Sequence, residues 1–188
     1  MPVSKKATTT TIAKVADPSQ VPYPPSWVDR FMDIVESLPA PYWLTYLIIG
    51  GIQTALLQIL IWIFDPTTRY VVQTESAIFP IWTWGVLALI TALDHEAIPA
   101  IHKFRHLLDD EDDDIQRLEY EASTMPARAV LLWIPVGVAL AFLIAFTNPT
   151  FQHHRDKPIL FGAFLFSGIA AFVIGGSIYV HSVHQLRL

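Results

Sequence analysis

Four stretches of this chain carry no charged side chain, and they constrain the fold more than any other feature. A helix that crosses the hydrocarbon core of a bilayer needs about 20 predominantly apolar residues, within a range of roughly 17–25. Helices in the core of a soluble domain normally keep a polar face, which these stretches lack. The four stretches are Tyr42–Phe64, Ala77–Leu93, Ala129–Phe146 and Ile159–Val180. The sequence therefore predicts an all-α, polytopic membrane protein with four transmembrane helices.

The polar segments between these stretches predict how the spans are grouped. Charged residues make up only 15% of the chain, against about 25% in an average soluble domain. We expect two transmembrane hairpins joined by a helical, acidic connector. In chain order, the predicted parts are a disordered cytoplasmic tail (1–25), an interfacial amphipathic helix (26–39), a first hairpin (42–93), the cytoplasmic connector (94–128), a second hairpin (129–181) and a cytoplasmic end (182–188).

The basic residues predict the orientation of these hairpins. Three of the 12 Lys and Arg residues fall in the loops after the first and third spans, namely Arg69, Arg155 and Lys157. The others lie in the N-terminal tail and the interfacial helix after it, in the connector and in the C-terminal end. Loops rich in Lys and Arg stay on the cytoplasmic side of a membrane. We therefore expect both termini to be cytoplasmic.

The segment "SWVDRFMDIVESL" has the pattern of a helix that lies on the membrane. Trp27, Phe31 and Leu38 fall on one face, and acidic residues such as Asp33 fall on the other. Such a pattern is typical of interfacial helices, with Trp27 and Phe31 as the main contacts. A helix packed against a cytoplasmic domain remains an alternative.

Small residues recur every four positions in the third and fourth spans. Stripes of this kind let two helix backbones approach closely in lipid. The sequence therefore predicts that these two spans pack against each other. The stripes are Gly137, Ala141 and Ala145 in the third span, and Ser167, Ala171 and Gly175 in the fourth.

The exits of the first and third spans look alike, which indicates a possible duplication. One reads "FDPTTRY" and the other "FTNPTFQ", with Pro66 and Pro149 in matching places. The first span also carries Gln53 and Gln58. Buried amides need partners in hydrocarbon, so we expect this face to point into the bundle.

The stretch "DHEAIPAIHKFRHLLDDEDDD" offers a candidate metal site. His102 and His106 are one helical turn apart, and Asp109 follows on the same face, a spacing that suits a divalent ion. The same residues also suit an amphipathic helix along the membrane surface, followed by a hydrated acidic run. We favour this second interpretation, with no bound metal, because zinc sites need at least three protein ligands.

Histidines near span ends suggest a second candidate site, for haem or another pigment. His95 ends the second span, and His181 and His184 end the fourth, so all three would lie on one side of the bundle. A bis-histidine haem uses ligands from facing helices. The chain has no cysteine, which excludes thiolate ligands and cysteine nucleophiles.

One segment resembles a known class of membrane domain. The residues "FPIWTWGVLALITALDHE" resemble the second helix of the small two-transmembrane domains attached to bacterial sensor and regulatory proteins. The ending "HSVHQLRL" is similar to a point where uncharacterised prokaryotic multi-pass proteins continue. The resemblance implies a membrane module without catalytic residues, in a prokaryotic plasma membrane.

The sequence therefore predicts a non-enzymatic integral membrane module, acting as an anchor, assembly or sensing subunit. Its expected partners are the lipid bilayer and other membrane or cytoplasmic subunits, with no nucleic acid. The alternative is a membrane protein that handles haem, pigment or a divalent metal through its histidines. Transport is less favoured, because no charged residue is expected deep within a span.

Overall fold

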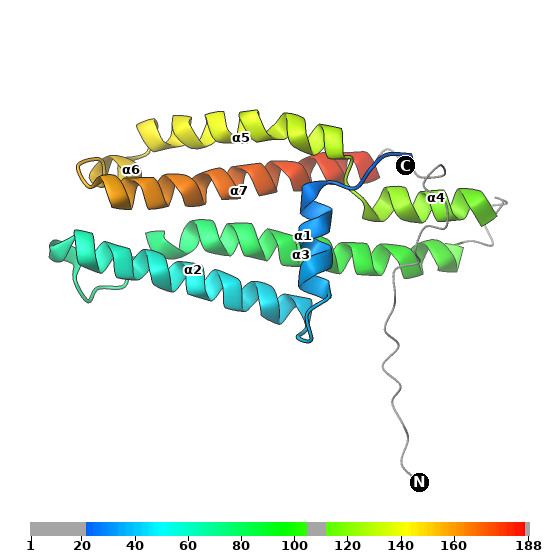
Figure 1. Ribbon diagram of the computed structural model, residues 1–188, viewed down its shortest axis with the longest axis horizontal. Coiled ribbons are helices and arrows are strands. Elements are labelled where there is room, and N and C mark those ends of the chain that lie inside the picture. The colour runs from blue at the N-terminus through cyan, green and yellow to red at the C-terminus, as the bar shows by residue number, and fades with distance from the viewer. Residues whose placement is uncertain (1–21, 105–111, 187–188) are drawn as a thin grey trace, which may run out of the picture.

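The computed structural model describes residues 22–104 and 112–186, and these form an all-helical protein without a named strand (Figure 1). The helices are α1 (Trp27–Glu36), α2 (Tyr42–Phe64), the 3₁₀ turn η2 (Pro66–Thr68), α3 (Glu75–Phe104), α4 (Asp112–Ser123), α5 (Ala127–Thr147), α6 (Pro149–His153) and α7 (Pro158–Gln185). Four of them, α2, α3, α5 and α7, are long and apolar enough to span a membrane. The predicted all-helical class is confirmed, and the described residues contain four helices that could span a membrane, as predicted.

Helix α7 lies at the centre of the bundle and packs against α5, α3 and α2. Two glycines, one on each helix, permit a close approach between α5 and α7. A Cβ on Gly137 of α5 would press on the backbone of Val173, and a Cβ on Gly176 of α7 would overlap the indole ring of Trp133. The Trp133 indole donates a hydrogen bond of 3.0 Å to the carbonyl of Phe172. Close contact between α5 and α7 therefore depends on hydrogen in place of a side chain at these positions.

The small-residue stripes face different neighbours. Gly137, Ala141 and Ala145 of α5 are buried, and Gly137 lies against α7. On α7, however, the Ser167 hydroxyl accepts from the Gln53 amide of α2, at 3.2 Å. Gly175 lies against Trp82 of α3. The predicted α7 stripe therefore faces α2 and α3 at these two residues, because a central helix has close neighbours on several sides.

The amides of α2 point into the protein and find partners there. The Trp84 indole donates to the side-chain oxygen of Gln53, Oε1, at 2.6 Å. Gln58 is buried, donates to the carbonyl of Val71 at 3.1 Å, and accepts from the Gln73 backbone at 2.8 Å. Hydrogen bonds of this kind satisfy polar groups that lipid would leave without a partner.

Helix α1 runs across the long helices instead of along them (Figure 1). A capping box begins it: the Ser26 backbone donates to the Asp29 carboxylate at 2.7 Å, and the Asp29 backbone donates to the Ser26 hydroxyl at 3.2 Å. Its buried apolar residues are Val28, Met32 and Val35. These belong to a core cluster that also includes residues of α2, α3, α5 and α7.

The apolar face predicted for α1 is split between two surroundings. Trp27, Ile34 and Leu38 are exposed on the protein. Phe31 is partly buried, and its ring centroid lies 6.0 Å from that of Trp84. The helix is therefore apolar on two sides, one packed against the bundle and one facing outward.

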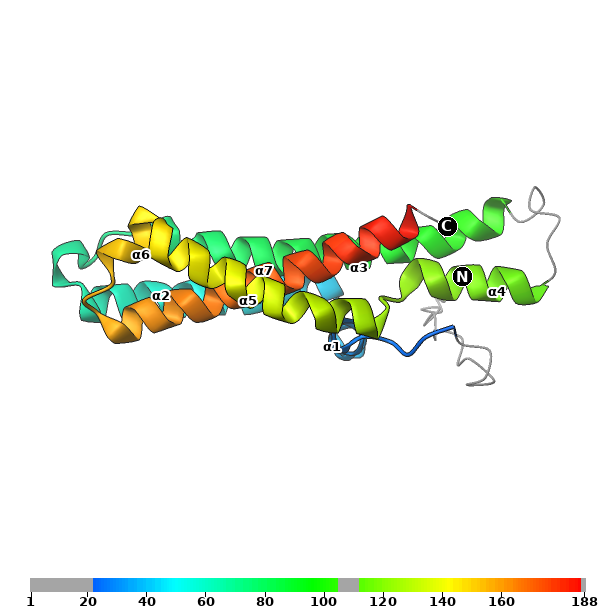
Figure 2. The same ribbon diagram turned by 90° about the horizontal axis from the view of Figure 1, so that it is seen from above.

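The second predicted span and the amphipathic helix expected after it are continuous as far as Phe104. Helix α3 continues without interruption to Phe104, with Pro99 inside it. Asp94 and His95 therefore lie on α3 itself, and α4 packs beside the far end of that helix (Figure 2). Only the neighbouring helices reveal this continuation, since they cover the side of α3 that carries Asp94.

Candidate functional site

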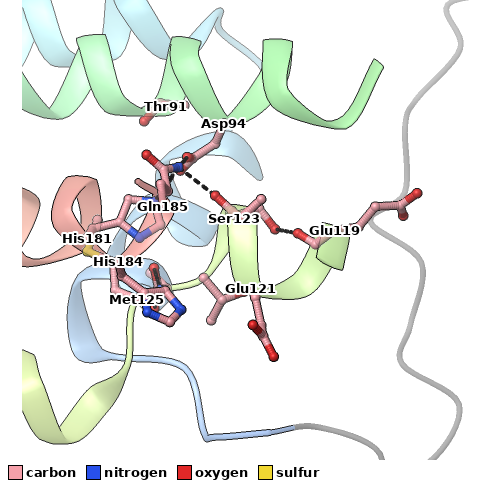
Figure 3. A network of polar contacts seen from close by, with 12 residues as sticks. Thr91, Asp94, Glu119, Glu121, Ser123, Met125, His181, His184 and Gln185 are labelled. Carbon is pink, nitrogen blue, oxygen red and sulfur yellow. Dashed lines mark hydrogen bonds and ion pairs between the residues drawn. The ribbon is translucent and has the colours of Figure 1, made fainter. Parts of the chain in front are cut away.

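Segments distant in sequence meet at the end of the bundle where α3 and α7 terminate. They are residues 22–26, α1, α4 and the linker 124–126, which together we call the cap. A short backbone bridge joins Pro25 to Pro126, so both linkers of the cap lie side by side. Figure 3 shows the polar side chains gathered between the cap and the two long helices.

At the centre of this network is a buried pair, Asp94 of α3 and His181 of α7. The His181 Nε2 atom lies 3.3 Å from Asp94 Oδ1, and the His181 side chain is 0% exposed. Asp94 Oδ2 and His181 Nδ1 are buried without a hydrogen-bond partner among the described residues. Such groups are costly to bury, and they make the pair sensitive to any change in charge.

Gln185 links this pair to the cap. Its Nε2 atom lies 2.6 Å from the Ala122 carbonyl of α4, 3.0 Å from His181 Nε2 and 3.3 Å from Asp94 Oδ1. A primary amide has two hydrogens to donate, so it cannot serve three acceptors well at once. Which acceptors Gln185 serves therefore depends on whether His181 Nε2 carries a proton. With Nε2 protonated, His181 donates to Asp94; with Nε2 bare, it accepts from Gln185.

The pair lies toward one end of two of the candidate spans. Asp94 lies inside the candidate span Ser76–Lys103 and His181 inside the candidate span Pro158–Gln185. At 1.5 Å per residue, Asp94 is about 27 Å along α3 from Ser76. The hydrocarbon core is about 30 Å thick. The sequence missed this charged residue as part of a span because α3 was expected to end at Leu93.

Tyr23 connects the first described residues to α4 and α7. Its hydroxyl lies 3.0 Å from the Thr124 carbonyl and 3.1 Å from His184 Nε2. Burial, followed by the charge of Glu121, raises the pKa of Tyr23, so the phenol is neutral. Tyr120 of α4 donates to the Tyr23 carbonyl at 2.8 Å. The single phenol proton is best given to Thr124, which leaves the oxygen to accept from His184.

Asp29 joins α1 to the linker after α4. Besides capping α1, its carboxylate accepts from the Met125 backbone at 3.1 and 3.2 Å. Burial raises the pKa of Asp29, and the hydrogen bonds from Ser26 and Met125 partly offset this effect. The carboxylate thus acts as a fixed joint between two parts of the cap.

Two more histidines pair with carboxylates at the rim of the cap. His95 Nε2 lies 3.1 Å from Glu36 of α1, and His102 Nε2 lies 3.0 Å from Glu119 of α4. Burial raises the pKa of Glu36, while His95 lowers it by a smaller amount. Both histidines are about half exposed, so each pair contributes only about 0–1 kcal/mol.

The histidines proposed as haem or pigment ligands are each held by a different protein partner. His95 pairs with Glu36, His181 with Asp94, and His184 with Tyr23. Of the residues proposed for a metal, His102 pairs with Glu119. His106 and Asp109 lie outside the described residues.

The partners of these histidines were not found from the sequence. Tyr23, Asp29 and Gln185 lie in segments that were interpreted as tail, amphipathic helix and chain end. One signal was present: His181 and Gln185 are one helical turn apart on the last span, and Asp94 is at the predicted end of the second.

Comparisons with protein-family models, curated proteins and solved structures find no match for this chain.

Proposed function

We propose that this protein is a non-enzymatic membrane module, a sensing subunit whose cap responds to protons on the cytoplasmic side. The observation that carries the proposal is the buried Asp94–His181 pair, which Gln185 connects to the backbone of α4. Histidine is the side chain whose charge normally changes between pH 5 and 8. A change of charge at His181 therefore alters the hydrogen bonds that hold α4 on the spans.

The proposed topology is two hairpins, α2–α3 and α5–α7, with both termini and the cap in the cytoplasm. The uneven distribution of basic residues supports this orientation. The exposed apolar side of α1, formed by Trp27, Ile34 and Leu38, suits the membrane interface beside the bundle. The α3 end and α4 then project into the cytoplasm, where a partner subunit can detect their position.

Labelling from each side of the membrane tests this topology. Val72 and Leu186 are highly exposed, at 76% and 87%, and the chain has no native cysteine. In intact cells, we expect an impermeant maleimide to label Val72→Cys and to spare Leu186→Cys until the membrane is opened. The reverse pattern would show that the cap faces outward.

The groups around His181 give the direction of the response. Asp94 faces it from α3, Asp29 contributes negative charge from α1, and α4 presents the Ala122 carbonyl through Gln185. A positive imidazolium would bind these carboxylates more strongly than a neutral ring does. The His95–Glu36 and His102–Glu119 contacts would likewise be ion pairs with a charged imidazole ring, and hydrogen bonds to a carboxylate with a neutral one.

The carboxyl groups of the cap add an effect of the same sign. Burial raises the pKa values of Glu36 and Asp29 above the ordinary values of these groups. A carboxyl group with a raised pKa binds its proton more tightly in the folded cap than in the released chain. Its contribution to the stability of the docked cap therefore falls as the pH rises above the ordinary pKa of the group. Both groups of residues predict a cap that is held tightly in mild acid and loosens as the pH increases.

Distance measurements between spin labels test this response. Ala100 of α3 and Gln116 of α4 are exposed and accept labels through cysteine substitution. We expect a narrow distance distribution at pH 6 and a broader, longer one at pH 8. His181→Gln should abolish most of this pH dependence, because its amide does not titrate.

A histidine at the opposite end of the bundle gives the matched control. His153 is exposed, and His153→Gln should leave the response of the two labels unchanged. A distance distribution that is the same at pH 6 and pH 8 in the otherwise unaltered protein would refute the sensing function.

A further inference from the structure

A second group of polar side chains lies at the end of the bundle opposite the cap. Asp65 follows α2, and His153 and His154 follow one another at the end of α6. Figure 1 places the end of α2 and α6 at the same end of the molecule. One donor atom from each of these three residues lies within 4.8 Å of the other two. Asp65 and His154 are buried in the protein, whereas the His153 side chain is exposed at its surface.

The Asp65 carboxylate has one oxygen committed to the fold and one facing cations. Its Oδ1 atom accepts from the Thr67 hydroxyl at 2.5 Å. Its Oδ2 atom lies 2.9 Å from the Lys157 ammonium and 3.4 Å from His153 Nε2. The Thr67 hydrogen bond, followed by that of Lys157, lowers the pKa of Asp65, so the carboxylate is ionised.

The two histidines differ in how firmly they are held. The His154 ring stacks on Phe164 of α7, with a centroid distance of 5.2 Å and an angle of 9°. The His153 ring meets His154 at 4.9 Å in an edge-on arrangement. His154 is thus held by packing, while the exposed His153 already lies beside Asp65 at the surface.

We propose that Asp65, His153 and His154 bind a divalent transition metal of the zinc class. Zinc takes imidazole nitrogen and carboxylate oxygen at about 2.0–2.2 Å, and sites with three protein ligands keep a fourth position for water. Ligand atoms of such a site are about 3.3 Å apart by tetrahedral geometry. The donor atoms, which lie within 4.8 Å of one another, therefore need to close by up to about 1.5 Å, and the exposed position of His153 leaves its ring room to move.

The Lys157 ammonium would compete with a metal ion for the Asp65 carboxylate. This ammonium neutralises the same Oδ2 atom that would bind the metal, so metal binding must displace it. The bound ion would join the loop after α2 to the loop before α7, on the side of the membrane away from the cap. This site goes beyond the proposed proton response and uses none of its residues.

Titration of the intact protein with zinc tests the site. The full chain, carrying an affinity tag without histidine, is purified in detergent, treated with chelator and titrated with ZnCl₂ by calorimetry. We expect one zinc per chain, with a dissociation constant of about 10 µM or lower. At a hundredfold excess of free zinc over that constant, Tm should rise by roughly 5 °C or more. Cobalt should give the visible absorption of a tetrahedral site.

Three variants separate this site from non-specific binding. His153→Ala removes an exposed ligand and should weaken binding by at least about 100-fold, since loss of groups that only support a ligand already costs about 10–100-fold. Lys157→Met should strengthen binding, because it removes the competing ammonium. His102→Ala, which alters an exposed histidine at the other end, should have no effect.

The proposal is overturned if the unaltered protein binds no stoichiometric zinc. It is also overturned if His153→Ala binds as tightly as the unaltered chain. Unchanged affinity in Lys157→Met would exclude Asp65 Oδ2 as a ligand. Circular dichroism of each variant confirms that the helices remain folded.

Discussion

Replacement of Asp94 by leucine should lower the free energy of unfolding by about 3 kcal/mol, because it breaks a buried pair from one side. The leucine side chain has a similar size but accepts no hydrogen bond. His181, which is 0% exposed, and Gln185 would both lose their common acceptor. Denaturation of the purified protein in detergent micelles, followed by circular dichroism, measures the effect.

Two further variants show whether the loss comes from the pair. The double variant Asp94→Leu with His181→Leu should recover much of the stability, since apolar residues often replace a buried ion pair without loss. Glu96 is an exposed acid on the same helix, and Glu96→Leu should change stability by less than about 0.5 kcal/mol. Equal losses from Asp94→Leu and Glu96→Leu would show that the buried contact contributes nothing.

Replacement of Gly176 by leucine should separate α5 from α7 and cost about 3 kcal/mol or more, at the upper end of the range for overpacking. Any side chain at this position overlaps the Trp133 ring, and the ring must leave its hydrogen bond to the Phe172 carbonyl. Unfolding in micelles would measure the loss of stability, and the fluorescence of a variant that keeps Trp133 as its single tryptophan would report the displacement of the ring.

Gly51 gives a matched control for this substitution. It lies on an exposed side of α2, and a Cβ there meets nothing within 4 Å. Gly51→Leu should leave stability unchanged or raise it slightly, because leucine favours helix more than glycine does. A comparable loss of stability in both variants would mean that α5 and α7 do not depend on close contact at Gly176.

The number and approximate position of the spans could be predicted from composition alone. Long runs without charge have few other solutions, since the backbone groups of a helix satisfy one another in lipid. The same pattern could not place the end of α3. Asp94 marks the end of a span if it faces water, but it continues the helix if His181 and Gln185 cover it.

The faces of the helices were only partly predictable. The period of small residues identified close-packing positions on α7, but it does not state which helix approaches each one. Ser167 and Gly175 face α2 and α3. Phe31 was predicted to be a lipid contact and lies against Trp84. Amphipathic patterns show that a face is apolar, and protein and lipid are both apolar neighbours.

The candidate sites depended most on the tertiary structure. The sequence drew attention to histidines at the ends of spans, and His181 is indeed central to the polar network. Its partners come from segments far apart along the chain, such as Asp94 and the Ala122 carbonyl. The outer cluster of Asp65 with His153 and His154 was not noticed, although the similar exits of the first and third spans pointed to one end of the bundle.

The sequence by itself determined that this is an all-helical protein with four candidate spans, because hydrocarbon accepts only long runs of apolar residues whose backbone bonds are satisfied internally. Only the tertiary structure decided which polar residues meet. A hydrogen bond requires two groups within about 3 Å, and that proximity depends on how α3, α4 and α7 pack. Residue spacing within one helix shows which residues share a face, but not which residues of another helix they meet.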